Sequence, residues 1–179
     1  MNITDASLGS IFAAVVAGAI SLISLVISKE NKTSEFRQLW IDSLRSELSL
    51  YVSHSMEIYR HRRWEKEQHG EKWESIVDSY LKANELITKI RLRLNPKEKS
   101  SRKILSMLRE YEVMFSDNAI PEDRDFNRLN HAFVGESQRL LKSEWNRVRN
   151  GEIVFQVVRS ASFSVLMVGL IALAYYFYM

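Results

Sequence analysis

The side chains that most often carry out chemistry are sparse in this sequence and poorly spaced for it. The four histidines include no pair four residues apart with a glutamate between them, the pattern of a zinc-binding helix. His61 and Glu65 form one isolated pair. There is no cysteine, which excludes thiolate metal ligands, disulfides and cysteine nucleophiles. The sequence therefore predicts a protein that is not an enzyme and that holds no metal or cofactor.

One short segment combines cations with aromatic rings. Its members are Arg60, His61, Arg62, Arg63 and Trp64. Guanidinium groups attract phosphates and aromatic rings stack on bases, so the segment is a candidate contact for a nucleic acid or for an acidic patch on a partner. The plainer interpretation is a solvated helix end, where cations complement the negative end of the helix dipole. Both interpretations stay open at this stage.

Charge is distributed unevenly along the chain. All 25 Lys and Arg residues, and all but one of the 22 acids, lie between residues 29 and 159. A chargeless run lies on either side of this segment. Each run is about as long as the ~20 residues that cross the hydrocarbon core of a bilayer. We therefore expect two transmembrane helices, over residues 8–28 and 160–179, with residues 1–7 as an external N-terminus and the lipid bilayer as a partner.

The residues that flank the two runs predict an orientation. Lys29 and Lys32 follow the first run, and Arg159 precedes the second. Basic residues are enriched in the cytoplasmic loops of membrane proteins. Residues 29–159 are therefore expected to form a cytoplasmic domain, with both chain termini on the other side of the membrane.

The first chargeless run carries a stripe of small residues, namely Ala14, Gly18, Ser21 and Ser28. Small residues let helix backbones approach closely, and serine hydroxyls can hydrogen-bond across such a contact. Two partners fit the stripe: the second run of the same chain, or another copy of the chain in a homo-oligomer. No ionisable residue lies within either run, which argues against a proton relay.

The central segment has the periodicity of α-helices, because apolar residues recur at spacings of three and four. Breaks at His69-Gly70, at Asn95-Pro96 and at residues 116–121 divide it into four helices. Ser34 is expected to cap the first helix, and Asn95 with Glu98 to form a capping box for the third. The predicted fold class is all-α: two transmembrane helices flanking a cytoplasmic antiparallel bundle of about four helices.

The apolar stripes of these helices define the expected core. On the first helix the stripe is Phe36, Trp40, Leu44, Leu48, Val52, Met56 and Tyr59. The second helix contributes Trp73, Ile76, Val77, Tyr80, Ile87, Ile90 and Leu94. The third contributes Ile104, Leu105, Leu108, Tyr111, Met114 and Phe115, and the fourth Phe126, Leu129, Phe133, Leu140, Leu141, Trp145 and Val148.

Two stretches resemble motifs of small bacterial two-pass membrane proteins. Residues 34–45 resemble an EFRQxWIDxLR phrase that opens the cytoplasmic helix of those proteins, and residues 90–98 resemble their I-x-L-R-L-N-P-x-E phrase. The matching residues are Phe36, Arg37, Trp40, Asp42, Arg45, Leu94, Asn95, Pro96 and Glu98. Packing explains these positions at least as well as ligand binding does, since Asp42 and Arg45 have the spacing of an ion pair within one helix.

Such two-pass proteins are similar to effectors of bacterial anti-phage systems, including those paired with retron reverse transcriptases. The resemblance implies a bacterial inner-membrane effector of abortive infection with both termini in the periplasm. It would perturb the membrane or form a pore after release or triggering by a cytoplasmic partner, such as a reverse transcriptase with its nucleic acid. The alternative is a passive membrane scaffold that docks a soluble enzyme or nucleoprotein through its helical domain.

Overall fold

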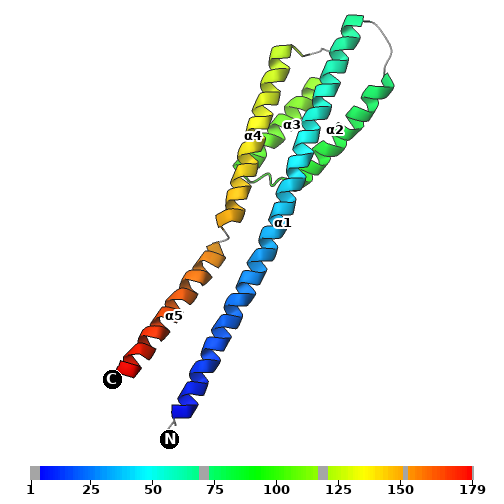
Figure 1. Cartoon of the computed structure of the whole chain (residues 1–179). Helices are drawn as coiled ribbons and strands as arrows, with labels where there is room; N and C mark the ends of the chain where they lie inside the picture. Colours follow the sequence, from blue (N-terminus) through cyan, green and yellow to red (C-terminus); the bar gives the residue numbers. More distant parts are fainter. Residues whose placement is uncertain (1–4, 69–72, 117–120, 151–152, 179) are drawn as a thin grey trace. The chain divides into compact units, whose positions relative to one another are not determined.

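The computed structural model describes residues 5–68, 73–116, 121–150 and 153–178, apart from some side chains within these ranges. The described residues form five α-helices and no strand, so the all-α prediction is confirmed. The helices are α1 (Asp5–Gln68), α2 (Trp73–Arg93), α3 (Lys99–Ser116), α4 (Asp123–Asn150) and α5 (Ile153–Tyr178), as Figure 1 shows. The predicted break at His69-Gly70, the external residues 1–4 and the side chain of Trp73 lie outside the described part.

The chain divides into two compact units. The bundle unit is Leu39–Asn146, and the two-helix unit combines Met1–Gln38 with Arg147–Met179. Helix α1 contributes to both units without a break, so the helix start predicted at Ser34 is wrong. The reason is local: residues 28–38 contain no glycine or proline and are rich in good helix formers, so nothing there interrupts the backbone hydrogen bonding.

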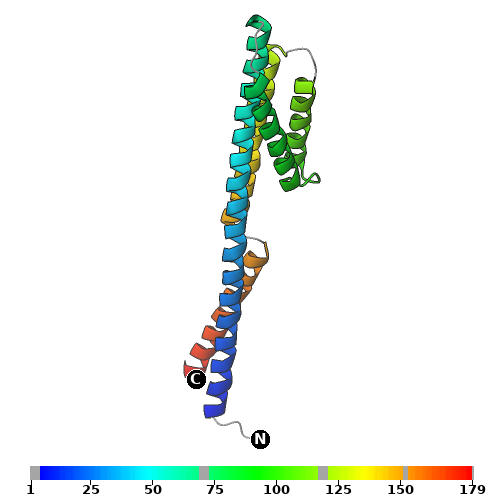
Figure 2. The same cartoon turned by 90° about the vertical axis from the view of Figure 1, so that its right-hand side faces the viewer.

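The bundle unit consists of four helical segments whose successive members run in opposite directions. The hairpin of α2 and α3 packs on one side of the pair formed by α1 and α4 (Figure 2). An aromatic cluster fills the centre: Tyr111 meets Tyr51 edge-on at 5.4 Å between ring centroids and Phe133 at 5.6 Å. Burial raises the pKa of the Tyr51 and Tyr111 hydroxyls well above their ordinary value. The predicted core residues Leu44, Leu48, Ile76, Ile87, Ile90, Leu94, Ile104, Leu108, Tyr111, Phe126, Leu129, Phe133 and Leu140 are all buried.

Three predicted core positions are wrong, because Phe36, Val77 and Trp145 are exposed. On α1 the cause is helical geometry. The predicted stripe advances in steps of four, and each such step rotates ~40° around a helix with 3.6 residues per turn. The observed core alternates steps of three and four and therefore keeps one face toward the neighbouring helices. Its members are Ile41, Leu44, Leu48, Tyr51, Ser55 and Ile58.

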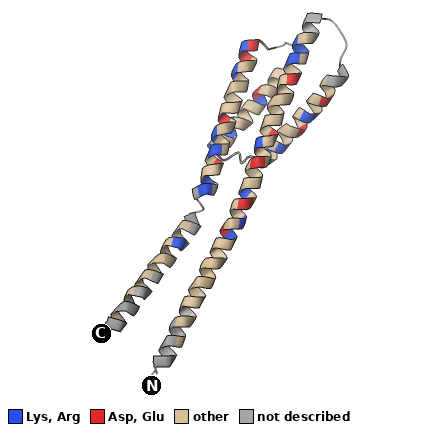
Figure 3. Cartoon of the chain, viewed as in Figure 1, with Lys and Arg blue, Asp and Glu red and all other residues tan. Residues whose placement is uncertain are grey.

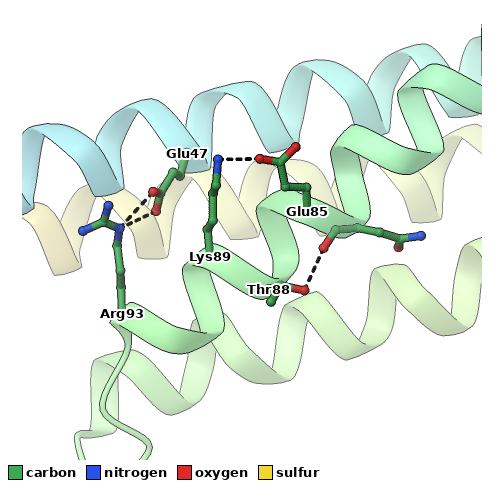
Figure 4. Close-up of polar contacts among 6 residues, drawn as sticks. Glu47, Glu85, Thr88, Lys89 and Arg93 are labelled. Atoms are coloured by element: carbon green, nitrogen blue, oxygen red, sulfur yellow. Dashed lines mark hydrogen bonds and ion pairs between the residues drawn. The ribbon is translucent and has the colours of Figure 1, made fainter.

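Polar contacts fasten each helix of the bundle to its neighbours. Arg93 at the end of α2 donates from Nε to both carboxylate oxygens of Glu47 on α1, at 2.9 and 2.7 Å (Figure 4). Lys103 on α3 donates to Glu136 on α4 at 3.0 Å and lowers the pKa of that carboxyl. Arg91 on α2 likewise pairs with a carboxylate of α3. These contacts fix which faces of the helices meet.

The two-helix unit has a different surface. The described parts of α5 and of the N-terminal third of α1 carry almost no charge (Figure 3). Large apolar side chains are exposed there, namely Ile20, Leu22, Leu25, Ile27, Val157, Phe163, Val165, Met167, Val168 and Ile171. On α1 the less exposed positions are Val16, Ala19, Ile23 and Val26, which share one side of the helix.

Two serine hydroxyl groups of this unit are bonded within their own helices. Ser21 donates to the carbonyl of Ala17 at 2.9 Å, and Ser164 donates to that of Ser160 at 3.0 Å. Residues 160–178 of the expected span 160–179 belong to α5, which begins earlier, at Ile153, and residue 179 lies outside the described part. Over its described residues, no helix is both long enough and apolar enough to cross a membrane.

Candidate functional site

A groove runs along one face of α1 in the bundle unit. Its volume is about 990 Å³, and the α1 side chains that line it are Val52, Ser53, Met56, Glu57, Arg60, His61 and Trp64. These positions recur at helical spacing and therefore share one side of the helix. Three members of the predicted contact segment, Arg60, His61 and Trp64, lie here. Val52 and Met56, two predicted core residues, are half-buried and pack against the core.

His61 is the most unusual residue of the groove. Both of its ring nitrogens are buried, and neither has a hydrogen-bond partner among the described residues. Its ring packs edge-on against Trp64, with 6.3 Å between ring centroids. A neutral imidazole offers one hydrogen-bond donor and one acceptor. Because both nitrogens are buried, the surface that the groove offers consists mainly of the exposed side chains of Arg60 and Trp64.

The other two arginines of the segment serve the fold. Arg62 donates from Nη1 to the carbonyls of Met114 at 3.3 Å and Phe115 at 3.1 Å. These carbonyls belong to the last turn of α3, where the helix dipole is negative and the carbonyls have no partner within their helix. The cation thus complements a helix end, as the plainer interpretation supposes. However, the helix end that Arg62 complements is that of α3 and not that of α1, which continues to Gln68.

Arg63 joins a second contact, at the start of α4. Its guanidinium bonds to the carboxylate of Asp123, and to the hydroxyl of Tyr59 at 3.3 Å. Tyr59 in turn donates to Asp123 and stacks on Phe126, with 4.0 Å between ring centroids. Burial and the bond to Asp123 raise the pKa of the Tyr59 hydroxyl. The predicted segment is therefore split, with two arginines directed into the bundle and the rest along the groove.

The first motif has a structural explanation in part. Asp42 and Arg45 form the predicted ion pair, on an exposed face of α1. Trp40 packs partly buried against the core. Phe36, the other aromatic residue of the motif, is 72% exposed and belongs to the two-helix unit. Arg37 lies next to it and is half-buried.

The second motif forms the turn between α2 and α3. Leu94 is buried, and the side-chain oxygen of Asn95 accepts the backbone N–H of Lys97 at 3.0 Å. The predicted capping box is wrong, since α3 starts only at Lys99 and Glu98 occupies the cap position. The carbonyl of Glu98 accepts the N–H of Arg102 at 3.0 Å. The backbone N–H of Glu98 donates to the carbonyl of Asn95 at 3.1 Å, so residues 95–98 form a turn before the helix.

Sequence reasoning missed Glu47, the buried partner of Arg93. A signal was present, because Glu47 lies three residues after Leu44 and four before Tyr51, on the stripe that forms the core. A carboxylate at such a position needs a cation to compensate its burial. Arg93, which supplies the cation, lies within the second motif. Its ion pair with Glu47 therefore joins that motif on α2 to the part of α1 that follows the first motif.

The small-residue stripe is not placed against α5. Ala14, Gly18, Ser21 and Ser28 are exposed, and a methyl group added at Gly18 would meet no atom within 4 Å. At 100° per residue the stripe lies opposite the side of α1 that carries Ile23 and turns toward α5. In the described part of the chain the stripe is therefore exposed. Packing against the second run of the same chain and contact with another copy both stay predictions.

No group of three or more metal-ligating side chains is present among the described residues. Comparison of the chain with protein-family models, with curated proteins and with solved structures gave no match in any of the three.

Proposed function

We propose that this chain is a two-span membrane effector of bacterial inner membranes, whose cytoplasmic helical bundle controls the state of its membrane segments. The observation that carries the proposal is the exposed apolar surface of the two-helix unit. Leu25, for example, is 67% exposed on α1. Water makes such a surface unfavourable, at about 25 cal/mol per Å² of apolar area. A bilayer removes that cost.

The internal hydrogen bonds of this unit support the same environment. A hydroxyl without a partner is costly in hydrocarbon, but Ser21 and Ser164 each donate to a carbonyl one turn earlier. The basic residues Lys29 and Arg159 stand at the ends of the two chargeless runs. By the positive-inside rule they assign the bundle to the cytoplasm and both termini to the periplasm.

The effector role is favoured by the bundle's lack of catalytic groupings among its described side chains, together with the motif resemblance. Such a bundle acts by binding and changing shape. Its trigger would be a cytoplasmic protein or nucleoprotein, with a reverse transcriptase and its nucleic acid as the partner that the resemblance suggests. The end of α1 that holds the groove is tied to α3 and α4 through Arg62 and Arg63. Binding there would act on the packing of the whole bundle.

The test is the membrane potential of bacteria that express the chain from an inducible promoter, with and without its neighbouring genes and phage, followed with a voltage-sensitive dye. Depolarisation and growth arrest support the effector. Gly18→Leu and Ser21→Leu should abolish it if copies meet along the stripe, because both positions are exposed on α1. Ala161→Leu, an exposed small residue on α5, is the matched control. An unchanged potential in every condition contradicts the effector proposal.

The groove on α1 favours a second candidate, the passive scaffold. Arg60, His61 and Trp64 offer an incompletely used binding surface, and a docking site needs no change in the membrane. A scaffold would recruit its partner to membranes while the potential stays normal. Arg60→Ala with Trp64→Ala should then release the partner, whereas Asp42→Ala on the exposed face nearer the membrane should not.

A further inference from the structure

A small crevice lies between α1 and α5 within the two-helix unit. Its volume is about 190 Å³. The side chains that line it are Ile23, Val26 and Ile27 from α1, and Val158, Arg159, Ser162 and Phe163 from α5. The surface of the crevice is almost entirely apolar, and the exposed Arg159 borders it. A crevice of this composition suits a molecule that is itself mostly apolar and carries an anionic group.

The charged residue of the crevice and its most apolar residues lie at opposite ends. Ile27 ends the first chargeless run, and Arg159 immediately precedes the second. Both therefore mark the same end of two antiparallel segments. Ile23 and Phe163 lie four residues further into their runs, which is ~6 Å along each helix. The cation stands at one end of the crevice and hydrocarbon lines the other.

We infer that this crevice binds one anionic phospholipid, with the phosphate on Arg159 and an acyl chain along Ile23 and Phe163. A guanidinium carries five N–H donors in a planar fork, so it can bond a phosphate in addition to contacts within the protein. Lys29, two residues beyond Ile27, supplies a second exposed cation at the same level. Basic pockets between membrane helices on the cytoplasmic side are where anionic headgroups bind. The inference rests on the proposed membrane location.

The expected preference follows from the charge. One arginine near the membrane surface favours an anionic lipid by about fivefold over a zwitterionic one. If the preference for anionic lipid came only from the net positive charge near the membrane surface, any basic residue of the unit would contribute to it. A bound lipid requires both the guanidinium at the crevice and the space beside it, so the two requirements can be tested separately.

The experiment uses the full chain reconstituted in vesicles of phosphatidylcholine and phosphatidylglycerol. Spin-labelled versions of each lipid report, by electron paramagnetic resonance, the fraction held at the protein. The wild type should hold phosphatidylglycerol about fivefold more strongly. Arg159→Gln should remove that preference, and Arg159→Lys should retain most of it. Arg149→Gln, which removes an exposed arginine outside the crevice, should leave it unchanged.

Ser162→Leu fills the crevice without altering charge and should also remove the preference; helix content by circular dichroism checks that this variant folds. Equal effects of Arg159→Gln and Arg149→Gln, or full preference in a folded Ser162→Leu protein, would overturn the inference. Alkaline carbonate extraction separates it from the proposed function. A chain that is extracted from membranes contradicts both, whereas a chain that stays embedded but shows no headgroup preference contradicts the lipid site alone.

Discussion

The two units of this chain use the same apolar residue types in opposite ways. In the bundle unit, leucine, isoleucine and phenylalanine are buried among four helices, and most charges lie outside, with Glu47 and Glu144 as buried exceptions. In the two-helix unit, two helices cannot enclose a core, so most of their large apolar side chains are exposed. The contrast shows that burial within the chain accounts for the first unit only. The second unit leaves its apolar surface exposed, and this is the surface that the proposed membrane location would cover.

The largest expected effect separates a buried ring from an exposed one. Phe133→Ala should lower the free energy of unfolding by about 3–5 kcal/mol, because it opens a cavity in the aromatic cluster. Phe36→Ala removes the same ring where it is 72% exposed, and should change stability by no more than about 0.5 kcal/mol. Urea unfolding of the detergent-solubilised protein, followed by circular dichroism, measures both. Similar losses would show that Phe36 is buried by a contact between copies.

The next effect contrasts exposed leucines of the two units. Leu22 on α1 is 68% exposed and Leu81 on α2 is 64% exposed. Leu22→Lys, nearer the middle of the expected span, should disfavour membrane insertion by about 2 kcal/mol, whereas Leu81→Lys should be tolerated because water already surrounds it. The membrane-embedded fraction of each variant, compared with wild type after carbonate extraction, is the readout. Equal behaviour of the two variants would remove the distinction between the units.

The smallest effect lies within the bundle unit and compares two ion pairs. The side chain of Glu47 is 11% exposed in its pair with Arg93, whereas that of Asp42 is 65% exposed in its pair with Arg45. Glu47→Gln removes the carboxylate charge opposite the partly buried guanidinium of Arg93. It should lower the free energy of unfolding by about 1–3 kcal/mol. Asp42→Asn should cost less than about 1 kcal/mol. Thermal unfolding of the two variants distinguishes them, and a larger loss for Asp42→Asn would contradict the assignment.

Local signals predicted the helical class and most of the core. The turn at Asn95-Pro96 and the end of α3 near residue 116 were readable because proline and polar clusters act on the backbone nearby. Ser34 illustrates the limit, since a good capping residue starts a helix only where the preceding residues are not already helical. The drift of the predicted stripe on α1 has a similar origin. Residues four apart are evenly spaced along the helix, but each successive one points in a slightly different direction around its axis.

The candidate site was predicted by residue type and not by orientation. Nothing local distinguishes Arg60 from Arg62, yet one is exposed at the groove and the other bonds carbonyls 52 and 53 positions away in the chain. The Glu47–Arg93 contact likewise joins residues 46 positions apart. Such partners are fixed by helix packing. A single sequence shows which side chains can pair but not which helix faces will meet.

The internal hydrogen bonds of Ser21 and Ser164 have a consequence for how this chain can diverge. A serine whose hydroxyl is already bonded to its own helix presents little polarity to its surroundings. At these two positions serine, alanine and glycine are therefore close to equivalent, and exchange among them should be nearly neutral in natural variants. Asparagine or aspartate, whose side chains cannot be satisfied by one carbonyl, should be rejected there. The tolerance of a position to mutation thus follows from its bonding and not from its place on a polarity scale.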